Sequence, residues 1–108
     1  MMETLKNIAT GLYSETNIEE GFFILKFNNE TAEKQLVTRE VDSSYIQFHF
    51  CAKGTSVFQF NEGNYKLPLS EEHSLLLYNP QRDLPINLEI APETWVISVF
   101  ISIKKFHS

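Results

Sequence analysis

The sequence has very little cysteine. Cys51 is the only one among the 108 residues, so an intrachain disulfide has no second thiol. Four-thiolate metal sites and CxxC redox centres, which need several cysteines, are excluded for the same reason. A fold that uses no disulfide suits a reducing compartment, and we therefore expect a cytoplasmic protein.

The sequence also lacks a recognisable targeting or membrane segment. Residues 1–6 have neither the basic flank nor the apolar run of a secretory signal. The longest apolar stretches are far shorter than the ~18 residues that span a membrane. We expect neither export nor membrane insertion.

Positive charge is scarce as well. The 9 Lys and Arg residues are outnumbered by 14 Asp and Glu, which gives a formal net charge of −5. Affinity for nucleic acid depends on cations that displace counterions from phosphates. This composition therefore argues against DNA binding by these residues alone.

What the chain does have is the composition of a folded core. Its residues are 43% hydrophobic and 13% aromatic, with nine phenylalanines. A domain of this length buries roughly two-thirds of its unfolded surface, which is enough for one core. It is too short for two domains or for a large α/β nucleotide-binding enzyme, so one small core must hold any site.

Alternating apolar and polar residues predict a series of short strands. Turn-forming residues separate them, and Gly63 in a short polar link predicts a β-hairpin. The expected strands are residues 22–27, 34–41, 45–51, 55–61, 65–69, 74–78, 86–90 and 94–103. With no long helical segment, this pattern predicts an all-β fold, an antiparallel β-sandwich or barrel with little helix.

Two of these strands carry strongly apolar faces. In residues 45–51, Ile46, Phe48 and Phe50 share one face, which we expect to be core. In residues 94–103, apolar side chains occupy one whole face and part of the other. An antiparallel sheet commonly exposes one face to water. Because this strand has apolar side chains on both faces, it needs a packing partner on each side of the sheet. The interior of a barrel would be one packing partner, and a second copy of the chain would be another. We expect a homodimer.

The order of elements in residues 45–103 resembles the cupin-like N-terminal domain of the arabinose-regulator (AraC) family of transcription factors. The resemblance rests on Phe48–Gly54, Phe58–Asn61, Tyr65–Leu67 and Leu75–Pro80. These give a strand, a glycine turn, a hairpin and an apolar run that ends in proline. The resemblance implies a cupin-like, jelly-roll fold that binds an effector and dimerises. It also implies a second half, a helix-turn-helix DNA-binding domain, which these residues lack.

This resemblance guides the expected division of the chain. Residues 1–19 are mixed and polar and are expected to form an N-terminal arm, followed by a cupin-like domain over 20–103. Residues 104–108 break the strand period and are expected to begin a truncated C-terminal helix.

The same comparison argues against a catalytic cupin. Those enzymes hold a metal with an HxH motif, a glutamate before the glycine turn and a final histidine. With Gly54 as the turn, Gln47 takes the glutamate position, Pro85 falls at the last histidine, and residues 41–43 contain no histidine. A neutral amide is a poor ligand for a divalent ion. We expect no metal, no cofactor and no enzymatic activity.

A ligand site is predicted where aromatic walls meet a few polar groups. His49 can exchange a hydrogen bond with a ligand, and Arg82 can bind a carboxylate unless its neighbour Asp83 competes. A satisfied histidine, a solvated loop arginine and purely structural phenylalanines remain open alternatives. Cys51 is expected to be a small buried apolar residue. The predicted ligand-binding residues are Tyr45, Gln47, His49, Phe58, Phe60, Arg82 and Trp95.

The leading hypothesis is a metal-free regulatory module of a cytoplasmic AraC-family transcription regulator. Its expected partners are a small-molecule effector, a second copy of the chain and, through the missing domain, DNA, but no membrane. An effector bound between the sheets would shift the arm or the dimer contact. The alternatives are a small stand-alone cupin enzyme of the isomerase or dioxygenase type, and a dimerisation module without a ligand.

Overall fold

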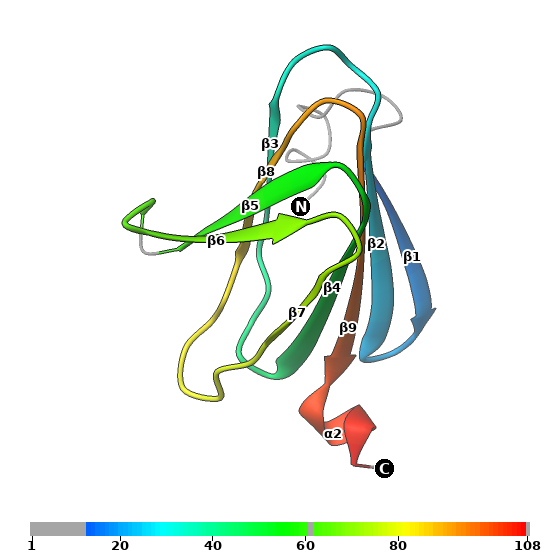
Figure 1. Cartoon of the computed structure of the whole chain (residues 1–108). Coiled ribbons are helices and arrows are strands. Elements are labelled where there is room, and N and C mark those ends of the chain that lie inside the picture. Colours follow the sequence, from blue (N-terminus) through cyan, green and yellow to red (C-terminus); the bar gives the residue numbers. More distant parts are fainter. Residues whose placement is uncertain (1–12, 61, 108) are drawn as a thin grey trace.

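The computed structural model describes residues 13–60 and 62–107, which form nine strands and one short helix (Figure 1). The first nine elements are β1 (Tyr13–Glu19), β2 (Phe22–Asn29), β3 (Gln35–Arg39), β4 (Tyr45–Lys53), β5 (Thr55–Phe60), β6 (Tyr65–Ser70), β7 (Ser74–Leu77), β8 (Ile86–Ile90) and β9 (Thr94–Ser102). The helix, α2 (Ile103–Phe106), follows β9 directly.

The strands form two antiparallel sheets. The five-stranded sheet has the order β1-β2-β9-β4-β7, and the four-stranded sheet has the order β3-β8-β5-β6. Each pairing is antiparallel, including β2 with β9 and β4 with β9 at the centre of the larger sheet. The all-β prediction is confirmed.

The core lies between the two sheets. Phe23 and Phe100 stack in parallel with ring centroids 4.6 Å apart, and the fully buried Phe58 belongs to the opposite sheet. These side chains alternate with outward residues, as a half-buried strand requires. The other buried apolar residues of the core cluster are Leu25, Phe27, Val37, Val41, Cys51, Leu69, Ile86, Leu88, Ile90 and Val96.

The prediction that Phe48 and Phe50 of β4 belong to the core is wrong. Phe48 and Phe50 are 40% and 41% exposed, whereas Gln47 and His49 are 1% exposed and face the core. Ile46 is buried, at the start of the strand. Alternation fixes which residues share a face but not which face turns inward. Here the polar face turns inward because its side chains find hydrogen-bond partners between the sheets.

On β9, too, large apolar side chains point away from the core. Trp95 and Ile97 are 48% and 37% exposed, while Val96, Ser98 and Phe100 are fully buried. The two strands pair directly, with Phe50 opposite Ile97, so their outward apolar residues are neighbours. The second packing partner expected for β9 is therefore needed on the outer side of the five-stranded sheet.

The structure describes part of each end of the chain. Residues 13–19 of the expected arm form β1, which pairs with β2 at the sheet edge, and residues 1–12 lie outside the described residues. At the other end α2 begins at Ile103, and the Ser102 hydroxyl accepts from the Lys105 backbone N–H at 3.0 Å. No helix within residues 13–60 and 62–107 is long and apolar enough to cross a membrane.

The turn between β4 and β5 depends on Gly54, which has a φ of +80°. A Cβ at this position would lie 2.8 Å from the Glu93 carbonyl oxygen and would collide with the Thr94 hydroxyl. We predict that Gly54→Ala lowers the free energy of unfolding by about 1–3 kcal/mol, as measured by urea denaturation. Gly63→Ala is the matched control, since Gly63 has a φ of +87° but an added Cβ would meet only Gln59, at 3.8 Å. Equal losses in the two variants would contradict the steric part of this explanation.

Candidate functional site

The seven predicted ligand-binding residues lie in four different places. Gln47, His49 and Phe58 are buried between the sheets. Phe60 and Arg82 line a pocket at one end of the sandwich, and Tyr45 lines a separate pocket. Trp95 is exposed on the outer side of the five-stranded sheet and lines neither of these two pockets.

Between the sheets, a chain of hydrogen bonds joins β9, β4 and the loop before β8. The Gln47 side-chain nitrogen donates to the Leu84 carbonyl oxygen at 2.8 Å, which leaves its side-chain oxygen to accept. His49 Nε2 lies 2.9 Å from that oxygen and therefore carries the ring hydrogen, while Nδ1 accepts from the Ser98 hydroxyl at 2.5 Å. Both ring nitrogens are thus occupied by the protein.

His49 is a neutral structural group in this setting. Burial lowers the pKa of its imidazole to about 3, since a charged ring would be desolvated among aromatic side chains. The ring packs 4.4 Å from Phe58 and 5.6 Å from Phe100, measured between centroids. A neutral ring with both nitrogens engaged is not poised to act as a general base. It fixes the position of Gln47 instead.

The end pocket has a volume of about 410 Å³ and lies between the end of the β5–β6 hairpin and the loop of residues 78–85. A volume of this size suits a small molecule. Phe60 and Tyr65 form an aromatic wall with ring centroids 6.2 Å apart. The lining residues of the end pocket are Gln59, Phe60, Tyr65, Asn79, Arg82, Asp83, Leu84, Pro85 and Asn87.

Local turn chemistry places Arg82 at this pocket. The Asn79 side-chain oxygen accepts from the Gln81 N–H at 2.9 Å, and the Asn79 carbonyl accepts from the Arg82 N–H at 3.3 Å. This is the turn that Asn followed by Pro favours. On the other side of the arginine, the Gln47 bond to Leu84 holds the loop to β4. The backbone that carries Arg82 is therefore fixed on both sides.

Asp83 does not form an ion pair with the guanidinium of Arg82. Its Oδ1 atom accepts from the Ser43 backbone N–H at 2.9 Å. Among residues 13–60 and 62–107, no ion pair or side-chain hydrogen bond joins Arg82 to another residue. The guanidinium is therefore open to a ligand.

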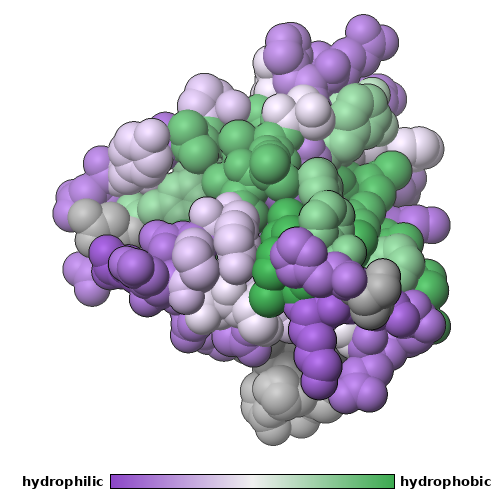
Figure 2. Space-filling view, turned by 90° about the horizontal axis from the view of Figure 1, so that it is seen from below, coloured by the Kyte–Doolittle hydropathy of each residue, from purple (hydrophilic) through white to green (hydrophobic). Residues whose placement is uncertain are grey.

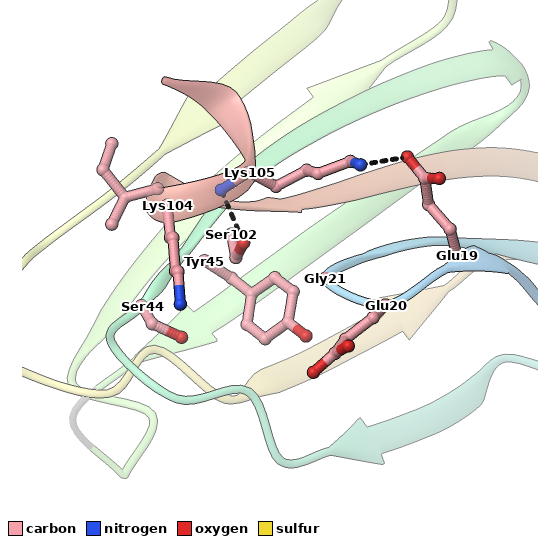
Figure 3. A pocket seen from close by; sticks show the side chains of 9 residues that line it. Glu19, Glu20, Gly21, Ser44, Tyr45, Ser102, Lys104 and Lys105 are labelled. Carbon is pink, nitrogen blue, oxygen red and sulfur yellow. Dashed lines mark hydrogen bonds and ion pairs between the residues drawn. The ribbon is translucent and has the colours of Figure 1, made fainter. Parts of the chain in front are cut away.

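A second pocket, of about 660 Å³, lies beside α2 (Figure 3). Lys105 and Glu19 form an ion pair of 2.5 Å across it, and Tyr45 stands between the turn after β1 and the helix. We call it the helix pocket. Its lining residues are Glu19, Glu20, Gly21, Ser44, Tyr45, Ser102, Ile103, Lys104 and Lys105.

The loop of residues 40–44 connects the two pockets. On one side the Ser43 N–H donates to Asp83, and on the other the Ser44 carbonyl accepts from the Ile103 N–H at 2.7 Å. Figure 1 shows α2 and the loop between β7 and β8 at the same lower end of the sandwich. Two hydrogen bonds through this loop therefore join the end pocket to the first residue of α2. Sequence reasoning missed these contacts, because Ser43 and Ser44 carry only a turn signal.

The outer side of the five-stranded sheet carries an apolar surface. Register places Phe48 opposite Val99 on β9 and opposite Leu76 on β7. A shallow groove of about 390 Å³ runs between these side chains. Seen from the end with α2, hydrophobic residues form a connected area that runs across the middle of the view toward its right side (Figure 2). We call the exposed residues Phe48, Phe50, Leu76, Trp95 and Ile97 the outer apolar face.

The described part of the chain offers no obvious metal centre. No group of three His, Cys, Asp or Glu side chains converges within residues 13–60 and 62–107. Cys51 is fully buried, as expected, and burial raises the pKa of its thiol. Its Sγ donates to the Lys53 and Gly54 carbonyl oxygens at 3.3 and 3.4 Å, so it is not set up as a nucleophile.

Comparison with known proteins defines the fold class. No protein-family model and no curated protein matches the chain, but solved structures do. A double-stranded β-helix protein from Klebsiella pneumoniae aligns with a TM-score of 0.62 at 10% identity, covering 92% of this chain and 84% of its own. An RmlC-like cupin from Desulfovibrio desulfuricans gives 0.58 at 13% identity, covering 88% and 92%.

A third match is the Cupin_2 domain of an XRE-family transcriptional regulator from Enterobacter cloacae. It gives a TM-score of 0.53 at 7% identity and covers 83% of this chain and 96% of its own. Together these structures show that the chain has the cupin fold, which confirms the jelly-roll prediction.

Proposed function

We propose that this chain is the effector-binding and dimerising module of a cytoplasmic transcription regulator of the AraC type, and that it works without metal and without catalysis. The observation that carries the proposal is the ligand-sized end pocket, which displays an unpaired guanidinium and is hydrogen-bonded through residues 40–44 to α2. The cupin domain of the Enterobacter cloacae regulator supports it, since that fold is used there in a regulator.

In this proposal the signal travels from the end pocket to α2. A ligand that moves the loop of Arg82 would disturb the Asp83–Ser43 bond and then the Ser44–Ile103 bond. Each such bond contributes about 1 kcal/mol net, and a typical allosteric coupling is about 1–3 kcal/mol. Two hydrogen bonds are therefore enough to bias the position of α2. This route stands beside the expected shift of the N-terminal arm or of the dimer contact.

The outer apolar face supports the dimerising half of the proposal. Large aromatic side chains present about 150–250 Å² each, so five residues exposed by 37–60% leave roughly 400 Å² of apolar surface. A standard interface buries about 800 Å² on each partner. The outer apolar face supplies about half of that area. If a second copy of the chain packs on this face, the interface has an apolar centre and a polar rim.

The proposal is tested with the full-length protein encoded by the gene. We expect the reading frame to continue into a helix-turn-helix domain, and the DNA affinity of the purified protein to change when a metabolite is added. The same preparation is analysed for metals. A full-length protein that contains stoichiometric iron, manganese, nickel or zinc, and whose DNA affinity is indifferent to every metabolite, would contradict the proposal and favour a cupin enzyme.

A further inference from the structure

We propose that the ligand of the end pocket is a small organic acid, with one carboxylate on a compact apolar body. This inference rests on the proposed function, because it names the class of molecule that the pocket takes.

The charge of the pocket selects a single negative group. Arg82 and Asp83 are the two charged residues of its lining. The guanidinium can hold a carboxylate through two parallel N–H···O bonds. A dianionic phosphate ester would need more than one cation and would be repelled by the Asp83 carboxylate, which remains beside the pocket. Arg82 is exposed, so a neutral ligand would leave its guanidinium solvated and would gain no charge-assisted hydrogen bond from it.

The walls of the pocket select an apolar body. Phe60 lies almost parallel to Phe58, with centroids 6.5 Å apart and planes 10° apart, so the aromatic wall continues the packing of the core. Tyr65 extends this wall, and Leu84 and Pro85 add aliphatic surface from the loop. Such a surface favours a ring or a branched alkyl group as the part of the ligand that packs against it, while the amides of Gln59, Asn79 and Asn87 can hydrogen-bond polar substituents elsewhere on the ligand.

The backbone that carries the arginine is also held in place before a ligand arrives. The Asn79 turn fixes the backbone on one side of Arg82, and the Gln47 bond to Leu84 fixes it on the other. Behind Gln47, His49 and Ser98 complete the chain of hydrogen bonds that holds its side chain. Preorganisation of this kind reduces the entropy lost on binding. Gln47 is therefore a positioning residue for the site and does not touch the ligand itself.

The test is a titration of the ¹⁵N-labelled chain with benzoate and isovalerate, followed by two-dimensional NMR. Benzamide serves as the neutral isostere of benzoate. We expect both acids to shift the amide signals of residues 82–84, 86 and 87 in a saturable way. Arg82→Gln should weaken their binding by about tenfold or more, and benzamide should bind about tenfold more weakly than benzoate.

Two control variants separate local from general charge effects. Lys53→Gln removes a positive charge from a residue that does not line the end pocket and should leave the affinity within about twofold. Asp83→Asn removes the negative charge of the pocket lining and should bind the acids at least as tightly as the wild type.

The inference is overturned if neither acid shifts these signals, or if Arg82→Gln binds both acids as well as the wild type. Neutral compounds that shift the same signals when the acids do not would overturn the ligand class and leave the proposed function standing. A protein that binds no metabolite at all would overturn both.

Discussion

Phe50→Asp is expected to convert a dimeric chain into a monomer. Phe50 lies at the centre of the outer apolar face, opposite Ile97 on β9, and 41% of it is exposed in the single chain. An aspartate there would place a charge in the middle of the desolvated contact. Central aromatic residues of interfaces contribute about 2–4 kcal/mol, so the dissociation constant should rise by roughly 30- to 1,000-fold. Sedimentation velocity over a micromolar concentration range measures the change.

Leu36→Asp is the matched control for this prediction. Leu36 is 60% exposed and lies on β3, an edge strand of the other sheet. The substitution removes a comparable apolar side chain and adds the same charge, but outside the proposed contact. The Leu36 variant should remain a dimer. If it dissociates as readily as the Phe50 variant, or if the wild type is a monomer at high micromolar concentration, the outer apolar face is not a dimer interface.

Acid is expected to destabilise the fold through His49. In the unfolded chain a histidine has a pKa of about 6.5, whereas burial lowers the pKa of His49 to about 3 in the folded state. Between these values the unfolded chain binds the extra proton. The stabilising effect of the neutral ring is therefore complete above pH 6.5 and is lost as the pH falls toward 3. The loss is about 1.4 kcal/mol per pH unit, which gives about 2 kcal/mol at pH 5.

The comparison protein for this measurement is His49→Gln. Glutamine can still exchange hydrogen bonds with Ser98 and Gln47 but does not titrate. Carboxylates with lowered pKa values, such as Asp42, destabilise both proteins equally in acid. Urea denaturation at pH 7 and pH 5 should show the wild type losing about 2 kcal/mol more than the variant. Equal losses would mean that the buried ring is not kept neutral by the fold.

The strands could be predicted from the sequence because they depend on local signals. Apolar alternation and the turn residues gave eight strands close to their observed bounds, and β1 was missed because its residues are mostly polar. These local signals do not predict which face of a strand points into the core. Gln47 and His49 face inward because their partners are Leu84 and Ser98, which lie 37 and 49 residues further along the chain. Nothing in the local pattern indicates such partners.

The candidate site was predictable only in part for the same reason. Phe60 and Arg82 could be singled out as an aromatic wall and a loop cation, and the fold brings them to one pocket. The contact between Asp83 and Ser43 spans 40 residues, so the freedom of the guanidinium could not be known in advance. Trp95 is predicted as part of an aromatic pocket wall, but it is 48% exposed on the outer side of the five-stranded sheet.

The central claim is that this cupin fold binds a small molecule at the end pocket without a metal. The most direct measurement is a thermal-shift screen of metabolites against the chain after treatment with a chelator, with Arg82→Gln screened in parallel. We predict that at least one metabolite raises the melting temperature of the metal-free wild type and has a smaller effect on the variant. A melting temperature that responds to divalent metal alone, or to no metabolite, would contradict the claim.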